Sequence, residues 1–167
     1  SLLTLLVAHR AVALLHPDLA GDALRKKVQE QLFTFFMPSP FSSSGTAAAA
    51  ERIAADLGAS FRTVAITEAF EREEAAAREM LVPGGTVPDP AALPPLTALT
   101  RQNVQARIRG QRMWNWANTS GGLFLQTGNM SEKSLGYTTV GGDLEGALSV
   151  IANLPKTVVI AMLERLL

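Results

Sequence analysis

The chain has 167 residues, is 47% hydrophobic and carries 15 basic and 15 acidic residues, so its formal net charge is zero. This length and hydrophobic content suffice for one domain with a sizeable core. The charge balance argues against a surface for duplex nucleic acid or for an anionic membrane. The absence of cysteine excludes disulfides, thiolate metal sites and cysteine nucleophiles, and it is compatible with a cytoplasmic protein. We therefore expect a single domain over residues 1–167.

Residues 2–15 predict a helix, because apolar side chains recur on one face at helical spacing. The members of this face are Leu2, Leu5, Leu6, His9, Val12 and Ala13. The apolar run stops at His9 and Arg10, which is too early for a membrane span of about 20 residues. A signal peptide would carry its positive charge before the apolar run and not after it. We therefore expect an almost fully buried core helix.

The next segments predict a βαβ unit. Residues 20–31 indicate a polar connector with room for a short helix at 22–28, and residues 32–37 predict a buried strand. A hydroxyl-rich loop follows, with Thr46 as the expected N-cap of a helix over 47–57 and Gly58 as its end. Residues 61–66 predict a second strand. This order of strand, helix and strand indicates a parallel sheet.

Two further helices are expected around a loop rich in proline and glycine. Residues 67–80 predict an acidic, exposed helix with Phe70 as its apolar anchor, and residues 81–96 predict a mobile loop. Residues 100–118 predict a long helix with buried positions at Val104, Ile108, Met113 and Trp116. Asn103 and Arg107 share a face of this helix, where an amide and a guanidinium could hold a carboxylate, phosphate or ribose hydroxyls. A surface ion pair of Arg107 is the alternative.

The chain is organised around residues 123–143. The apolar run 123–125 predicts a buried strand, and the polar Thr127 and Glu132 follow it. Open α/β sheets bind ligands at the carboxyl ends of their strands. Lys156 follows Pro155 at the expected start of a closing helix over 158–167, where an ammonium and backbone N–H groups could meet a phosphate.

A hydroxyl, a carboxylate for a divalent metal and a lysine together suit a nucleotide. The chain contains neither GxxxxGK[ST] nor GxGxxG, so a P-loop kinase and a simple Rossmann dehydrogenase are excluded. His9 and His16 have no metal-ligand spacing, and we expect both to be structural. The residues alone therefore indicate a nucleotide-binding α/β domain.

Four segments carry a resemblance to a known family. They are MPSPFSS (37–43), NVQARIR (103–109), TGNMSEKSLGYTTVGGD (127–143) and LPKT (154–157). In this order they resemble the synthetase domain of NAD synthetases, most closely the glutamine-dependent branch. The resemblance implies an adenine nucleotide alpha hydrolase-like fold, a parallel sheet flanked by helices. It also implies that ATP and Mg2+ activate deamido-NAD as an adenylate, which ammonia converts to NAD.

The resemblance assigns roles to matching positions. For ATP these are Ser1, Met37, Ser42, Ser43, Thr127, Gly128 and Lys156, and for deamido-NAD they are Asn103, Arg107, Glu132 and Asp143. Glu132 would also ligate Mg2+. Lys156 and Asp143 would be catalytic, since Lys156 would neutralise phosphate charge during adenylation and Asp143 would line the nicotinate or ammonia end.

Three departures from the family pattern accompany this resemblance. The phosphate loop SGGxDS is expected before Ser1, so we expect the chain to be truncated at both ends and inactive by itself. Pro40 stands where the family pattern has an arginine. The family's C-terminal segment, which helps close the site, and a nitrilase-like glutaminase domain are also expected but not found in these residues. The parent protein could carry both, or the chain could use free ammonia.

The resemblance also implies a homodimer or higher homo-oligomer, in which Trp114 and Trp116 could be interface residues; plain core packing is the alternative for both. Two other functions stay open at this point. One is a non-catalytic nucleotide-binding or dimerisation remnant, and the other is an amidating ligase of the same fold that acts on a different carboxylate.

Overall fold

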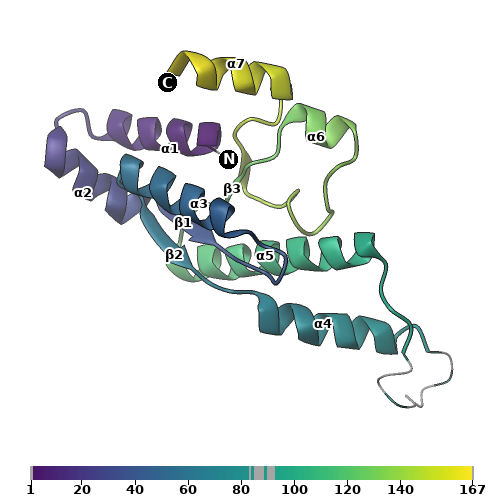
Figure 1. The fold of residues 1–167 in the computed structure, drawn as a ribbon. Coiled ribbons are helices and arrows are strands. Elements are labelled where there is room, and N and C mark those ends of the chain that lie inside the picture. Colours follow the sequence, from purple (N-terminus) through teal and green to yellow (C-terminus); the bar gives the residue numbers. More distant parts are fainter. Residues whose placement is uncertain (1, 83, 85–88, 90–92, 167) are drawn as a thin grey trace.

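The computed structural model describes residues 2–82, 84, 89 and 93–166 as an α/β arrangement (Figure 1). Its elements are α1 (Leu2–Leu15), α2 (Gly21–Gln31), β1 (Phe33–Phe36), α3 (Ser44–Leu57), β2 (Ser60–Thr63), α4 (Thr67–Glu79), α5 (Ala98–Ser120), β3 (Leu125–Gln126), α6 (Met130–Ser134), β4 (Leu148–Ser149) and α7 (Lys156–Leu166). The parallel strands are flanked by helices, which confirms the predicted fold class.

The predicted βαβ unit is present. β1 and β2 pair in parallel from Phe33 opposite Ser60 to Phe36 opposite Thr63, and α3 makes the crossover. Successive side chains of a strand point to opposite faces. Phe33 and Phe35 both contact the Trp116 ring of α5, with ring centroids 5.1 Å apart in each pair. Figure 1 accordingly shows α5 and α3 on opposite sides of this strand pair.

The second strand pair differs from the prediction. The strand expected at 123–125 begins at Leu125, and Leu123 is 60% exposed, because the chain is still turning after the left-handed Gly121 that ends α5. β3 and β4 pair in parallel over two residues each, and among the described strands neither pairs with β1 or β2. Gly146 permits this close pairing, since a Cβ there would lie 2.7 Å from the Cβ of Gln126.

Two helix predictions were wrong in extent. The segment 20–31, expected as a connector, forms the 11-residue helix α2. The buried Val28 of this helix packs against Val12 of α1 and against Leu32. Polar residues outnumber apolar ones in this segment, so its apolar face was missed. The α3 helix begins at Ser44, because the hydroxyl of Ser43, and not that of Thr46, accepts the capping hydrogen bond.

The first helix has the predicted bounds but not the predicted burial. Leu3 and Val12 are buried, whereas Leu14 is 63% exposed and Leu15 is 74% exposed. One stripe of α1 packs on α2 and α3, and Leu3 also joins Ile151 and Val159 under α7. The expectation of an almost fully buried helix was therefore wrong.

The α4 and α5 helices pack together beside the first strand pair. Their shared core consists of Met37, Ile66, Phe70, Val104 and Ile108. Phe70, Val104 and Ile108 are buried as predicted, whereas Met113 and Trp116 are half-buried. Half of the predicted mobile loop at 81–96, namely positions 83, 85–88 and 90–92, lies outside the described residues.

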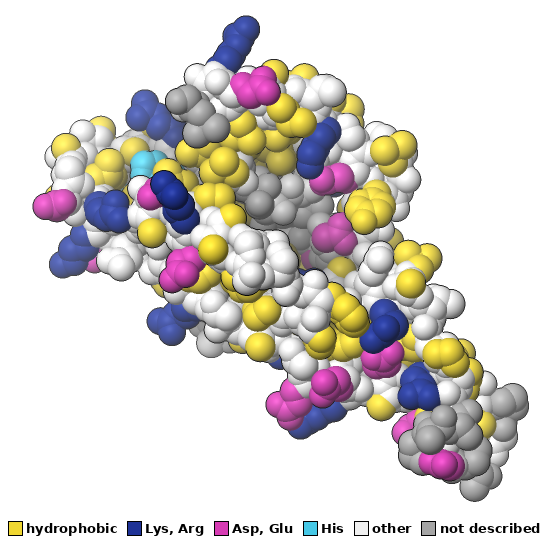
Figure 2. Space-filling model, in the orientation of Figure 1, with side chains coloured by type: hydrophobic (Ala, Val, Ile, Leu, Met, Phe, Trp, Pro, Cys, Tyr) yellow, Lys and Arg dark blue, Asp and Glu magenta, His cyan; other side chains and the backbone are white. Residues whose placement is uncertain are grey.

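The surface carries charges of both signs. Figure 2 shows acidic and basic side chains interspersed over one face, in keeping with the zero net charge of the chain. Within the described ranges, no helix combines the length and the apolar character that a membrane crossing requires.

Candidate functional site

The segment that follows β3 is fixed by a capping box at the start of α6. Asn129 Oδ1 accepts a hydrogen bond from the Glu132 backbone N–H at 3.1 Å, and Glu132 Oε2 accepts one from the Asn129 N–H at 3.0 Å. Reciprocal bonds of this kind satisfy two donors that a helix start leaves unpaired. Asn129 is buried, so the Glu132 carboxylate is held at a defined position just beyond the carboxyl end of β3.

Two motifs far apart in the sequence meet at this carboxylate. Lys156 Nζ lies 3.3 Å from Glu132 Oε1, and the Lys156 backbone N–H donates to Ser131 Oγ at 3.0 Å. The start of α7 is thereby attached to α6. The structure thus brings Glu132 and Lys156 together at the carboxyl end of β3.

The pKa of Glu132 reflects these contacts. Burial raises the pKa of this carboxyl, but the hydrogen bond from the Asn129 backbone and the ammonium of Lys156 lower it by more, so its net pKa lies below the ordinary range. Glu132 is therefore an anion at neutral pH. Its negative charge can orient Lys156 beside any phosphate that approaches the start of α7.

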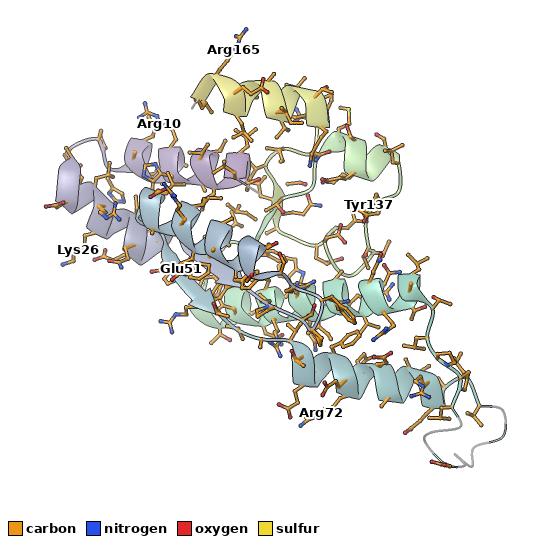
Figure 3. All side chains as sticks on the ribbon, in the orientation of Figure 1. Arg10, Lys26, Glu51, Arg72, Tyr137 and Arg165 are labelled. Atoms are coloured by element: carbon orange, nitrogen blue, oxygen red, sulfur yellow. The ribbon has the colours of Figure 1, made fainter. Side chains whose placement is uncertain are left out.

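Asp143 organises the loop at residues 139–143 against α5. Its Oδ1 accepts a hydrogen bond from the Thr139 N–H at 2.8 Å, and Thr139 Oγ1 donates to Asn103 Oδ1 at 2.8 Å. Arg107 Nε donates to the carbonyl of Val140 at 3.1 Å. Asn103, Arg107 and Asp143 therefore lie in one contact region, as their assignment to a common ligand requires. Tyr137 is exposed on the segment that leads from α6 to this loop (Figure 3).

The loop after β1 uses its hydroxyls internally. Ser42 Oγ accepts a hydrogen bond from the Ser39 N–H at 3.0 Å, and Ser43 Oγ accepts from the Thr46 N–H at 3.2 Å. Met37 is buried and lines an apolar pocket of about 210 Å³ with Phe35. Its carbonyl accepts a hydrogen bond from Arg109 Nε at 3.0 Å, and burial lowers the pKa of the Arg109 guanidinium.

The assigned residues thus fall into separate groups. Glu132 and Lys156 form one, Asn103, Arg107 and Asp143 form another, and Met37 joins the second through Arg109 of α5. Thr127 is exposed and Gly128 is buried beside the Gln126 amide. Ser1 lies outside the described residues. Whether these groups bind ATP and deamido-NAD stays a prediction.

One polar cluster escaped sequence reasoning. Lys133 Nζ donates to Ser149 Oγ at 2.8 Å, and the Ser149 hydroxyl donates to Gln126 Oε1. Gln126 Nε2 in turn donates to the carbonyl of Asp143 at 2.9 Å. The sequence contains these polar residues, Gln126 and Ser149, but it did not reveal that the two short strands that end with them, β3 and β4, pair with each other.

The residues do not by themselves form a divalent-cation site. Both oxygens of Glu132 are taken, one by Asn129 and the other by Lys156. In the part of the chain that the structure describes, no three His, Cys, Asp or Glu side chains gather as metal ligands would. Ligation of Mg2+ by Glu132 therefore stays a prediction.

The tryptophans of α5 are engaged inside the chain. Trp114 Nε1 donates to Glu145 at 3.2 Å and its ring meets Phe124, while Trp116 packs on Phe33 and Phe35. These contacts favour the core alternative for both side chains. Assembly into a homodimer or larger oligomer stays a prediction.

Fold and site together define a parallel α/β domain with polar side chains gathered at the carboxyl ends of β3 and β4. The family model for NAD synthase matches residues 7–167. The chain therefore belongs to the NAD synthase family, which confirms the resemblance of its motifs.

Known relatives agree with this assignment. The glutamine-dependent NAD(+) synthetase of Synechocystis sp. is 35% identical over 141 residues, which is 83% of this chain and 22% of that protein. The structure of the glutamine-dependent NAD+ synthetase from Acinetobacter baumannii, in complex with adenosine diphosphate, matches 82% of this chain and 24% of its own at 28% identity, with a TM-score of 0.71.

The fold extends to the ammonia-dependent branch. The NH3-dependent NAD synthetase from Campylobacter jejuni matches 87% of this chain and 56% of its own with a TM-score of 0.68 at 24% identity, which shows the fold alone. The chain spans 22% of the length of the Synechocystis enzyme and 24% of that of the Acinetobacter baumannii enzyme, so both of these relatives are much longer proteins.

Proposed function

We propose that this chain is the synthetase part of an enzyme that amidates deamido-NAD to NAD at the expense of ATP. A carboxylate is a poor acyl donor until one of its oxygens becomes part of a good leaving group. In the first step a nicotinate oxygen attacks the α-phosphorus of ATP, and the bond to pyrophosphate breaks. In the second, ammonia attacks the acyl carbon, AMP departs with that oxygen, and the nitrogen loses a proton.

The pairing of Glu132 with Lys156 carries this proposal, because it joins two motifs of the family at one strand end. In our proposal Lys156 stabilises the charge that develops on the phosphates, and Glu132 orients it. Asn103, Arg107 and Asp143 hold deamido-NAD, while Met37 and Thr127 lie by ATP.

We propose that residues 1–167 form one domain, that ATP enters as its Mg2+ complex, and that the protein is cytoplasmic and oligomeric. The presence of adenosine diphosphate in the Acinetobacter baumannii relative supports nucleotide binding. Ammonia would be free or would come from a glutaminase domain.

The test supplies the full-length protein with deamido-NAD, ATP and ammonium, and quantifies NAD, AMP and pyrophosphate. We expect the three products in equal amounts. Lys156→Met should reduce the rate about a hundredfold or more, as loss of an electrostatic stabiliser does, whereas Lys26→Met on the exposed surface of α2 should not. Nucleotide binding without NAD formation would instead establish the non-catalytic alternative, and amidation of another carboxylate would establish the related ligase.

A further inference from the structure

An ammonium group outside the roles proposed above lies at the ends of the second strand pair. Lys133 of α6 is half-buried, and its Nζ donates to Ser149 Oγ at 2.8 Å. Ser149 ends β4, and Gln126, which accepts the Ser149 hydroxyl hydrogen, ends β3. Both strand ends therefore hold the ammonium at the edge of the sheet where parallel α/β folds bind ligands.

The charge of Lys133 is not matched by a nearby carboxylate. Among the residues that the structure describes, none places a carboxylate oxygen within 4.0 Å of Lys133 Nζ, and the acceptor found there is a neutral hydroxyl. An ammonium has three donors, so one hydroxyl leaves most of its capacity unused. A partly buried charge without a counter-charge costs free energy, which an anionic ligand would offset.

The same cluster is continuous with the loop that carries Asp143. Gln126 is 3% exposed, and its Nε2 donates to the Asp143 carbonyl at 2.9 Å. Asp143 Oδ1 in turn accepts from Thr139, whose hydroxyl donates to Asn103 of α5. Hydrogen bonds thus connect Lys133 to two residues that we assign to substrate binding, so the ammonium belongs to a network of fixed polar groups.

We propose that Lys133 is a phosphate-binding residue of the nucleotide site, with its ammonium contacting a phosphate oxygen of the bound nucleotide. Ser149 and Gln126 are positioning residues, which hold the ammonium at the strand ends. This inference rests on the proposed function, because ATP and deamido-NAD are its two sources of phosphate. Both present the same anionic oxygens, and the experiment separates them.

The experiment measures by calorimetry the binding of ATP, deamido-NAD and adenosine to the full-length protein and its Lys133→Met variant. We expect affinity for one phosphate-bearing ligand to fall about tenfold or more, as loss of a hydrogen bond to a charged group predicts. Affinity for adenosine should stay within twofold. The ligand that weakens identifies the source of the phosphate.

Matched variants separate charge from structure. Lys133→Arg should retain most of the affinity, and Ser149→Ala should lose a smaller part, about two- to fivefold, since the charge remains without its tether. Lys26→Met is the surface control, because Lys26 projects from α2, at the opposite side of the view from α6 (Figure 3). If Lys133→Met does not fold, the Ser149→Ala and Lys133→Arg results decide, together with the salt dependence of wild-type binding.

The outcomes are distinct. Unchanged affinities in a folded Lys133→Met variant, while the wild type binds both ligands, would overturn this inference and leave the proposed function intact. A wild-type protein that binds neither ATP nor deamido-NAD would overturn both. An equal loss for adenosine and ATP would show that Lys133 acts on the fold and not on phosphate.

Discussion

Among single residues, Glu132 has two structural tasks, since one oxygen closes the capping box of α6 and the other meets Lys156 of α7. Its pKa is lowered in the folded chain, so ionisation of Glu132 stabilises the fold above the ordinary pKa of 4.5. That stabilisation is lost as the pH falls through the lower pKa of the folded state.

Glu132→Gln tests this stabilisation by the ionised carboxylate, because glutamine retains the hydrogen bonds of a capping box without the charge. We expect the variant to be less stable than the wild type at pH 7 by roughly 0.5–1 kcal/mol, a modest value because the pair is partly exposed. The difference should shrink toward zero as the pH falls below 4.5. Urea unfolding across this pH range measures it.

The control is a double-mutant cycle with Lys156→Met. Once the ammonium is removed, Glu132→Gln should have a smaller effect at pH 7, because the attraction that lowers the pKa has gone. If the free energies of unfolding of the wild type and Glu132→Gln differ by the same amount at pH 7 and pH 3, ionisation of Glu132 does not stabilise the fold.

For secondary-structure elements, the start of α3 illustrates what the sequence could and could not determine. The alanine-rich run and Gly58 predicted the helix and its end, but several hydroxyl residues with a glycine offered more than one cap. The choice depends on the φ and ψ angles of the loop, and Ser43 is the residue with extended backbone before the first turn. Local sequence therefore predicted the helix, but the cap predicted from it, Thr46, was wrong.

A pair of variants distinguishes the two caps. Ser43→Ala should lower the free energy of unfolding by about 1 kcal/mol, the usual cost of removing an N-cap. Thr46→Ala should cost less, because the Thr46 backbone N–H remains available to Ser43. Denaturant unfolding measures both, and a larger loss for Thr46→Ala would restore that residue as the cap.

The packing of α5 on the loop 139–143 depends on glycine. A Cβ at Gly142 would lie 2.9 Å from the Ala106 Cβ and 2.9 Å from the Ala106 carbonyl carbon. Because the added Cβ would meet backbone of α5 and not only a side chain, the loop would have to shift. The contact between Thr139 and Asn103 would shift with it.

We therefore expect Gly142→Ala to destabilise the chain by about 1–3 kcal/mol, the range for inserting a methyl group into tight packing. In the full-length protein it should also weaken deamido-NAD binding. Gly45→Ala is the matched control, because Gly45 lies in α3 with nothing within 4 Å of the added Cβ. It should stabilise the chain by up to about 1 kcal/mol. Equal effects of the two variants in unfolding experiments would refute the close contact.

Across the whole molecule, the sequence predicted which motifs share an edge of the fold but not which atoms meet there. The rule that parallel strands present their carboxyl ends to ligands correctly brought Glu132 and Lys156 together. It could not place the partners of Lys133, because the two-residue strand β4 was not predicted and the strand expected at 123–125 begins only at Leu125. The exposed end of α1 was also missed, since an apolar sequence does not reveal which face has a neighbour.

Nucleotide binding makes a prediction for the stability of the molecule as a whole. A ligand that binds only the folded state at a hundred times its Kd stabilises that state by about 2.7 kcal/mol. For a domain of this size, that corresponds to a rise in Tm of roughly 5–11 °C. We expect saturating ADP to produce such a rise in the full-length protein, as measured by calorimetric melting. Adenosine should produce less, and Lys156→Met should reduce the ADP effect. An unchanged Tm at millimolar ADP would argue against a nucleotide site, because the fold would then lack the binding free energy on which the proposed chemistry depends.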